Sequence, residues 1–329
     1  MKKKFLIFSL IFLILIGSLT GCSRTTEPLT KTGFYFDTVI SVTIYDTSKE
    51  YTLDHCMELA AHYENLFSPT LENSDIWKIN HSAGAPVTVD SETAFLIEKA
   101  LSYAALTDGL LNPAIAPLTS LWNFSSEAAD THQVPDSATI TEKLAHTDYH
   151  NITVSGQTIS LSDPEASIDL GCIAKGYIAD KLKEYLVKEQ VESALINLGG
   201  NVLAVGSKPT GTPFTIGIQK PFADSGTPAT TISLTDSSAV TSGIYERYFE
   251  QDGTLYHHIL DPKTGYPVDN TLASVTILSQ SSTDGDALST SCLLLGLDDG
   301  TALIESLPDI EALFITKDGA LHYTTGFPK

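Results

Sequence analysis

Cysteine is scarce in this chain. Four of its 329 residues are cysteines, and no two of them form a Cys-x-x-Cys pair. One of the four, Cys22, ends an N-terminal targeting segment, so an odd number remains for the folded part. This count argues against a disulfide framework and against a zinc site. We interpret Cys56, Cys172 and Cys292 as buried thiols.

Positive charge is scarce as well. The chain has 19 Lys and Arg residues against 40 Asp and Glu residues, a formal net charge of −21. Without the three lysines of the targeting segment, 16 basic residues remain against 40 acidic ones, a net charge of −24. A protein this acidic is a poor candidate for non-specific nucleic-acid binding. Internal repeats and low-complexity tracts are also lacking, and the length suffices for one large domain or two intertwined ones.

A long apolar run follows three lysines at the N-terminus. Residues 5–17 are apolar, and a small-residue cleavage site ends at Cys22. The run is too short for a membrane span, and the pattern is typical of a bacterial lipoprotein signal peptide. We therefore expect residues 1–22 to be the signal peptide, with a lipid such as palmitate on Cys22. An ordinary signal peptide with a chance cysteine is the less favoured alternative.

The predicted signal peptide sets the expected domain bounds, and the hydrophobic pattern predicts the fold. Residues 23–31 are predicted to be a tether and residues 32–329 a single domain, held at the extracytoplasmic face of the bacterial cell membrane. Hydrophobic periodicity predicts an α+β fold, in which mixed, largely antiparallel sheets are flanked by helices. Residues 34–45 alternate as a strand, and residues 53–67 have the pattern of an amphipathic helix.

Helix caps and turns divide the rest of the chain into short elements. We expect Ser74 and either Asp90 or Ser91 to cap two helices, and Thr139 with Glu142 to form a capping box. Further strands are predicted at residues 152–154, 158–161, 193–198, 202–205, 214–218, 230–234 and 239–249.

Polar groups gather between residues 256 and 290. A pair of histidines ending in His258 precedes a Pro/Gly turn and a return strand, after which an acid and hydroxyl cluster opens a helix. Asp286 and Thr290 are four residues apart, so on a helix they share one face. Their oxygen atoms suit Mg²⁺ better than zinc. Alternatively, Asp286 is simply a first-turn acid favoured by the helix dipole.

Three other segments carry candidate binding groups. Residues 168–177 have the pattern of a strand, a glycine turn and a helix, which binds phosphate, and Asp169 and Lys175 add charge there. Residues 107–118 are apolar but interrupted by two prolines, so they form an irregular loop that lines either the core or a flat ligand. Thr241 and Ser242 precede a glycine and either bind a phosphate or ribose or mark a bulge.

With these pieces in order, the sequence resembles the ApbE family, the FAD:protein FMN transferases, from about residue 34 to the C-terminus. The matching motifs are Phe36-Asp37-Thr38, Ser68 with Ser74-Asp75 and Asn80, Gly109 to Leu118, Asp169 to Gly176, Leu198 to Asn201, Thr241-Ser242-Gly243, His258 to Pro262 with Thr264-Gly265, and Asp286 to Thr290. The chain departs from the family pattern at three places. Asp37 replaces a glycine, Asn112 replaces an acid, and Thr70 stands where many relatives have an aromatic residue.

The resemblance implies a fold with intertwined subdomains and a phosphoryl-transfer reaction. FAD is split at its pyrophosphate, FMN is attached through its phosphate to a threonine or serine of another protein, and AMP leaves. Mg²⁺ would be held by Asp286, Thr290, Ser289 and the backbone carbonyl of Cys172. His258 would be the base, or else a structural histidine bonded to the Asp261 turn. The implied FAD contacts are Phe36, Thr70, Leu110, Leu111, Asn112, Asp169, Lys175, Thr241, Ser242 and Leu260.

Two other functions stay open on the sequence. The same site with water as acceptor would be an FAD pyrophosphatase that yields FMN and AMP. A lipid-anchored small-molecule binding protein would use Asp286 and Thr290 only to cap a helix. The chain has no acceptor segment of the Ser/Thr-Gly-Ala-Thr type. The expected acceptor is therefore another chain, a membrane or extracytoplasmic redox protein.

Overall fold

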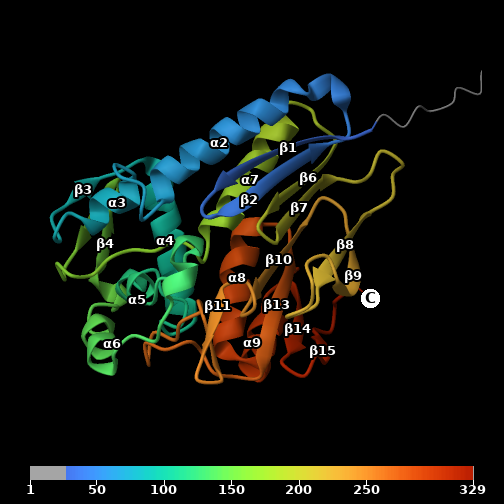
Figure 1. The fold of residues 1–329 in the computed structure, drawn as a ribbon. Coiled ribbons are helices and arrows are strands. Elements are labelled where there is room, and N and C mark those ends of the chain that lie inside the picture. Colours follow the sequence, from blue (N-terminus) through green and yellow to red (C-terminus); the bar gives the residue numbers. More distant parts are fainter. Residues whose placement is uncertain (1–26, 329) are drawn as a thin grey trace, which may run out of the picture.

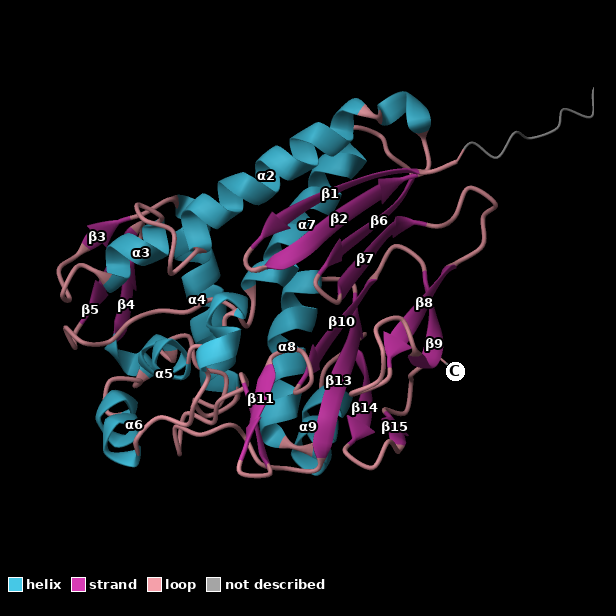
Figure 2. Ribbon diagram, in the orientation of Figure 1, coloured by secondary structure: helices cyan, strands magenta, loops and turns pink. Residues whose placement is uncertain are grey.

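A computed structural model describes residues 27–328, so the predicted signal peptide and Cys22 lie outside the described part. An eight-stranded sheet forms its centre, with the order β1-β2-β6-β7-β10-β13-β14-β15 (Figure 2). Each neighbouring pair is antiparallel. The strands are β1 (Leu29–Tyr35), β2 (Thr38–Ile44), β6 (Ser193–Leu198), β7 (Asn201–Gly206), β10 (Ser238–Gly243), β13 (Leu272–Ser279), β14 (Glu311–Thr316) and β15 (Leu321–Tyr323).

Helices cover one face of this sheet, and a two-stranded ribbon covers part of the other (Figure 1). All eight residues of β13 are buried, because α8 packs on one side and apolar side chains of the ribbon lie on the other. The covering helices are α2 (Tyr51–Phe67), α7 (Ala174–Lys188), α8 (Ser282–Leu295) and α9 (Leu297–Glu305), and the ribbon is β8 (Phe214–Gln219) with β9 (Pro228–Leu234). Among residues 27–328, no helix has both the length and the apolar character needed to cross a bilayer.

Residues 68–168 form a second lobe beside the sheet (Figure 1). Its three-stranded sheet has the order β3-β5-β4. Its elements are α3 (Asp75–Asn80), β3 (Val87–Thr88), α4 (Ser91–Leu106), α5 (Ala116–Trp122), α6 (Ser137–Leu144), β4 (Ile152–Ser155) and β5 (Thr158–Leu161). Two short 3-10 helices, η2 (Ser126–Thr131) and η3 (Tyr149–Asn151), also lie in this lobe, and η1 (Thr47–Lys49) precedes α2 in the first lobe.

The C-terminal half of the chain returns to this second lobe. The hairpin of β11 (Tyr248–Gln251) and β12 (Thr254–His257) packs its aromatic rings on Trp122, whose ring centroid lies 5.7 Å from that of Tyr256. The indole Nε1 of Trp122 also donates a hydrogen bond to the carbonyl of Gly265 at 2.8 Å. The expected α+β fold with intertwined subdomains is therefore confirmed.

The strand predicted over residues 34–45 is confirmed only for residues 38–44, which form β2, because residues 34 and 35 belong to β1 and a turn joins the two strands. β1 and β2 are joined by Phe36 and Asp37, which have left-handed φ angles of 53° and 55°. A two-residue turn preserves the alternation of period two, and Phe-Asp is not a usual turn pair, so the pattern concealed the reversal. β1 also begins at Leu29, inside the range expected to be the tether.

Other boundaries differ for local reasons. Residues 168–170 are not a strand, because the backbone N–H of Ile168 donates to the Asn80 side chain at 2.7 Å instead of to a sheet ladder. Asp136, not Thr139, caps α6. The predicted strand over residues 239–249 is broken after Gly243 and resumes as β11. The proline loop ends in α5, since a proline in the first turn of a helix is tolerated.

Candidate active site

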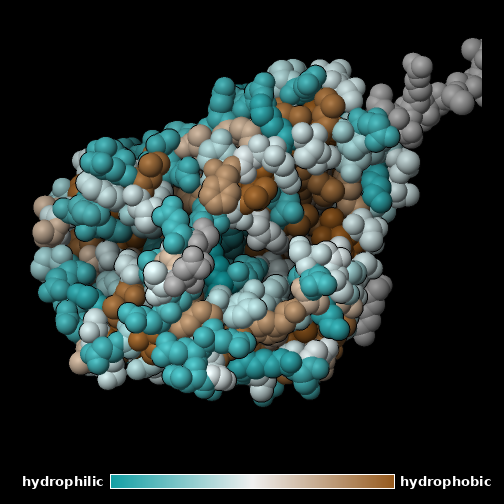
Figure 3. Space-filling model, viewed as in Figure 1, coloured by the Kyte–Doolittle hydropathy of each residue, from teal (hydrophilic) through white to brown (hydrophobic). Residues whose placement is uncertain are grey.

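A cleft of about 1550 Å³ lies between the two lobes, and Figure 3 shows it as a hollow with apolar side chains along its rim. Fourteen of the fifteen candidate binding, catalytic and metal-ligating residues line it, and Ser289 does not. The residues brought together are Phe36, Thr70, Leu110, Leu111, Asn112, Asp169, Cys172, Lys175, Thr241, Ser242, His258, Leu260, Asp286 and Thr290. The sequence motifs, far apart along the chain, therefore converge on one cavity.

Asp286 lies on α8 at the wall of the cleft with 2% of its surface exposed. Its Oδ2 atom accepts a hydrogen bond from the backbone N–H of Gly176 at 2.9 Å. Its Oδ1 atom is 3.6 Å from the Lys175 Nζ, and within residues 27–328 it has no hydrogen-bond donor at closer range. The Oδ1 atom of this nearly buried carboxylate has only a 3.6 Å ion pair with Lys175, so it fits a further cation, because a buried charge is costly unless it is well paired.

A line of hydroxyl groups continues from Asp286. The Ser289 hydroxyl donates to the Asp286 carbonyl at 2.9 Å, so in its 2.8 Å contact with Ser242 it must accept. Ser242 therefore donates its only hydroxyl proton to Ser289. In the 3.1 Å contact between Ser242 and Thr290, Thr290 must then be the donor. The lone pairs of Thr290 Oγ1 therefore stay available to a metal ion. Ser289 itself is fully buried, and its position makes it a support for Thr290.

The turn before α7 adjoins Asp286 and also lines the cleft. Asp169 is held in place by the Thr119 hydroxyl at 3.0 Å and by the backbone N–H of Gly171 at 2.8 Å. Lys175 donates to the Gly171 carbonyl at 3.1 Å. Burial, reinforced by the Asp169 and Asp286 carboxylates, raises the pKa of the Cys172 thiol well above its usual range. The Cys172 side chain is thus a neutral thiol, so the group with which Cys172 could bind a hard cation is its backbone carbonyl oxygen.

His258 directly follows β12. Its Nδ1 atom is 3.3 Å from the carbonyl oxygen of Arg247, which can only accept, so Nδ1 carries the proton and Nε2 carries the lone pair. Burial and the Arg247 guanidinium lower the pKa of His258 to about 3, so the ring is neutral at physiological pH. The Asp261 turn is closed by the backbone N–H of Gly265 at 2.8 Å. The alternative of a histidine bonded to that turn is therefore not what the structure contains.

The expected flavin contacts divide into exposed and structural positions. Leu110 and Thr70 have side-chain surface accessible from the cleft, whereas Leu111 is fully buried in the main core. The amide of Asn112 donates to the Thr147 carbonyl at 2.7 Å and accepts from the backbone N–H of Ala114 at 2.8 Å. Asn112 therefore braces the proline loop, and this role explains why an amide is accommodated there.

Three other expected contacts have partners within the fold. The Leu260 side chain belongs to the apolar cluster around Trp122, so its backbone is the part nearest a ligand. Thr241 is 2.8 Å from the Thr276 hydroxyl. Phe36 donates its backbone N–H to Glu64 at 2.7 Å, which fixes the left-handed turn at the cleft rim.

Asp37, which replaces the family glycine, also has a clear role. Arg247 Nη2 is 3.3 Å from the Asp37 carboxylate and 3.1 Å from its backbone carbonyl. This pair joins the β1–β2 turn to the segment whose carbonyl holds His258. Sequence reasoning missed it because the two residues are 210 positions apart.

Glu246 and Asp180 are two further acids that the sequence did not indicate. Glu246 lines the cleft and is accessible from it, yet partial desolvation by the cleft walls raises its pKa to about 7 against the opposing influence of Lys175. Asp180 lies on α7 behind the cleft wall and bonds to the start of α8. A signal was available for Asp180, because it stands one helical turn after Gly176 on the face that packs inward.

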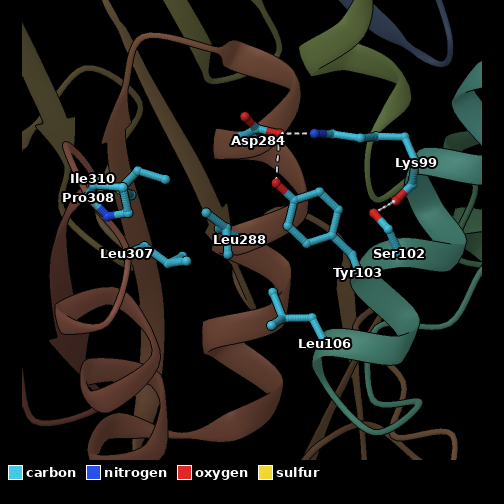
Figure 4. A pocket seen from close by; sticks show the side chains of 9 residues that line it. All are labelled: Lys99, Ser102, Tyr103, Leu106, Asp284, Leu288, Leu307, Pro308 and Ile310. Atoms are coloured by element: carbon cyan, nitrogen blue, oxygen red, sulfur yellow. Dashed lines mark hydrogen bonds and ion pairs between the residues drawn. The ribbon is translucent and has the colours of Figure 1, made fainter.

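A smaller cavity of about 440 Å³ lies on the other side of α8, against α4 (Figure 4). At its polar end, the Asp284 carboxylate accepts from the Tyr103 hydroxyl at 2.6 Å and lies 2.8 Å from Lys99 Nζ. Burial and this bond raise the pKa of Tyr103 well above its usual range. The first turn of α8 is thus tied to α4.

Comparison with known proteins agrees with this arrangement. The model of the ApbE family matches residues 36–314. A Klebsiella pneumoniae protein named FAD:protein FMN transferase is 44% identical over 264 residues, which are 79% of this chain and 81% of the relative. A Treponema pallidum protein of the same name is 34% identical over 331 residues, 94% of this chain and 90% of the relative.

Solved structures give the same result. The crystal structure of the ApbE protein from Thermotoga maritima superposes with a TM-score of 0.83 at 32% identity, covering 91% of this chain and 97% of that one. The family match, from residue 36 to residue 314, includes all the predicted binding, catalytic and metal-ligating residues, and the relatives and the superposition each cover more than three quarters of the chain. The chain therefore belongs to the ApbE family.

Proposed function

We propose that this protein is an FAD:protein FMN transferase, which moves FMN from FAD to a threonine or serine of another protein and releases AMP. The family and the names of the relatives support flavin transfer to protein. One observation carries the chemistry. The Asp286 carboxylate, the Thr290 hydroxyl and a neutral His258 line the same cleft.

The residues present fit Mg²⁺. Asp286 Oδ1, Thr290 Oγ1 and the backbone carbonyl of Cys172 would hold it, and Ser289 would support Thr290 from behind. The bound ion would neutralise negative charge on the phosphate oxygens. These donors are one carboxylate, one hydroxyl and one carbonyl, the oxygen ligands that Mg²⁺ prefers.

His258 would take the proton of the acceptor hydroxyl on its Nε2 atom. The acceptor oxygen forms a bond to the FMN phosphorus, the bond from that phosphorus to the AMP oxygen breaks, and the proton then passes from His258 to solvent. In the free cleft the pKa of His258 is about 3. The negative charge of a bound pyrophosphate raises the basicity of a neighbouring imidazole, so the ring becomes a better base when substrate is present.

Lys175 and Asp169 would orient the substrate. The Lys175 ammonium is anchored to the Gly171 carbonyl and faces Asp286, a position from which it can pair with a phosphate oxygen. The half-buried Leu110 and the exposed Thr70 would lie along the flavin. Without an aromatic residue at position 70, stacking on the flavin would come from elsewhere on the cleft wall, where Phe36 is available.

We also propose that the mature chain is held by a lipid on Cys22 at the extracytoplasmic face of the bacterial membrane. The lysines, the apolar run and the cleavage site support this location. The acceptor would then be a membrane or extracytoplasmic redox protein.

The decisive experiment uses the soluble form that lacks residues 1–22. It is mixed with FAD, Mg²⁺ and an acceptor domain bearing a threonine, and the acceptor mass and the released nucleotides are followed. The proposal expects a mass gain of one FMN with AMP in solution, both lost in Asp286→Ala. Free FMN and AMP with an unmodified acceptor would make the protein an FAD pyrophosphatase, and intact FAD would make it a binding protein.

A further inference from the structure

Helices α7 and α8 approach unusually closely at their N-terminal turns. A Cβ atom added to Gly176 would lie 2.2 Å from the carbonyl oxygen of Ser282 and 2.8 Å from the Cβ of Asp286. No side chain fits there without displacing the α8 backbone. The same closeness allows the Gly176 N–H to reach Asp286 Oδ2 at 2.9 Å. Gly176 therefore sets both the separation of the helices and the rotation of the Asp286 carboxylate.

Asp180 lies one helical turn further along α7 and caps α8 from outside. Its carboxylate accepts from the backbone N–H groups of Ser282 at 2.8 Å and Thr283 at 2.9 Å. It also accepts from the Thr283 hydroxyl at 2.6 Å and from the Ser281 hydroxyl at 3.3 Å. The first N–H groups of a helix have no partner within it, so a carboxylate that binds two of them fixes where the helix begins.

We infer that Gly176 and Asp180 form a clasp that positions Asp286 for the metal ion. Asp180 fixes the start of α8, Asp286 follows within about one turn, and Gly176 binds Oδ2 so that Oδ1 is the oxygen without a close donor. Asp180 does not line the cleft, so it is a positioning residue that acts through Asp286. The inference rests on the proposed use of Mg²⁺ and extends it to residues behind the metal ligands.

The clasp has a measurable consequence. Residues that orient a metal ligand without touching the metal typically change metal affinity by about 10–100-fold when they are replaced. Asp180→Ala removes the hydrogen bonds that Asp180 accepts from residues 281–283 but leaves the predicted ligands in place. Metal affinity should fall, and high Mg²⁺ should restore most of kcat because the reacting groups are intact.

The test is a calorimetric titration of Mg²⁺ alone, without FAD, into the form that lacks residues 1–22. We expect Asp180→Ala to raise the Kd about 10-fold or more and Asp180→Asn to raise it less, since an amide oxygen can still accept. The matched control is Asp75→Ala. Asp75 likewise accepts a backbone N–H, that of Asp90 at 2.7 Å, and the Thr93 hydroxyl at 3.0 Å, but it lies outside the cleft.

The outcomes separate the two proposals. A control that loses thermal stability but keeps the wild-type Kd, beside an Asp180→Ala protein with a weakened Kd and a raised KM for Mg²⁺ at nearly unchanged kcat, supports the clasp. A folded Asp180→Ala protein that binds Mg²⁺ as tightly as wild type overturns it, and Asp180→Asn serves if the alanine variant does not fold. A wild-type protein that binds no Mg²⁺ overturns the metal proposal itself, and the clasp with it.

Discussion

At the scale of single residues, Asp286 combines burial with incomplete pairing. The residue has 2% of its surface exposed, and its carboxylate has one donor on Oδ2 and the Lys175 ammonium at 3.6 Å from Oδ1. Burial of a charge opposes folding unless the charge is well paired. Such a group is kept at the expense of stability, which is the pattern expected of a metal ligand.

Replacing Asp286 by asparagine tests whether this carboxylate serves activity at the expense of stability. The amide keeps an oxygen for the Gly176 N–H but lacks the charge. We expect flavin transfer to fall by about 100-fold or more, while the melting temperature stays equal or rises. Transfer assays and thermal denaturation of the same preparation measure both effects. A marked loss of stability with retained transfer would contradict the assignment.

His258 gives a second prediction at this scale. His258→Ala removes the proposed proton acceptor but leaves the proposed metal ligands and flavin contacts unchanged. Transfer should fall by about 10²–10⁴-fold, the usual contribution of a general base. FAD binding, measured by quenching of flavin fluorescence, should stay within a few-fold of wild type. Equal losses in binding and transfer would instead make His258 a binding residue.

The neighbouring His257 makes stability depend on pH. It is buried, with Nε2 3.1 Å from the Val268 carbonyl, and burial lowers its pKa to about 4. The unfolded chain, with an ordinary histidine pKa near 6.5, binds the proton more readily. Stability therefore falls as pH drops below about 6.5, by roughly 2 kcal/mol at pH 5 for this group.

The matching experiment compares wild type with His257→Gln between pH 5 and 7. Glu246 acts in the opposite direction, because a carboxyl pKa raised to about 7 makes the folded state the better proton binder above pH 4.5. The difference in melting temperature between the two proteins isolates His257. It should change in favour of the variant as pH falls. A difference independent of pH would show that His257 does not titrate in this range.

At the scale of elements, the β11–β12 hairpin carries His258 and is held by Trp122. That indole stacks on Tyr256, contacts Phe249 at a centroid distance of 6.4 Å, and bonds to the Gly265 carbonyl. Trp122→Ala should cost about 3–5 kcal/mol of unfolding free energy and lower transfer as well, because the segment before His258 loses its support. Denaturant unfolding and transfer assays measure the two losses, and Trp122→Phe should recover part of both.

Local patterns predicted the elements and the parts of the site that lie within one element. The pair Asp286 and Thr290 could be predicted because four residues make about one helical turn, and α2 could be predicted from its apolar face. The reversal between β1 and β2 could not be predicted, because Phe36 and Asp37 are held by Glu64 and Arg247 and not by their own turn preference. Asp180 and Ser289 act through contacts across elements, which spacing alone does not reveal.

At the scale of the whole molecule, the proposed lipid on Cys22 is the property that would decide where the protein is located. Cys22→Ala should move the protein from the membrane fraction to the soluble fraction and abolish labelling by a fatty acid. The cleft forms from residues far from position 22, so the purified variant should keep wild-type transfer to a soluble acceptor. Retention of the variant in membranes would indicate another anchor.

The position of β1 limits how far the cleft can lie from the membrane if Cys22 is the anchor. β1 is hydrogen-bonded along its length to β2, and its far end, at Phe34 to Phe36, borders the cleft. Seven paired residues span about 20 Å, and the six residues from position 23 to 28 add at most about 20 Å. If Cys22 carries the proposed lipid, the cleft would therefore lie within about 40 Å of the bilayer surface. An acceptor hydroxyl held more than about 40 Å from the bilayer surface could then not enter the cleft, whatever the sequence around it.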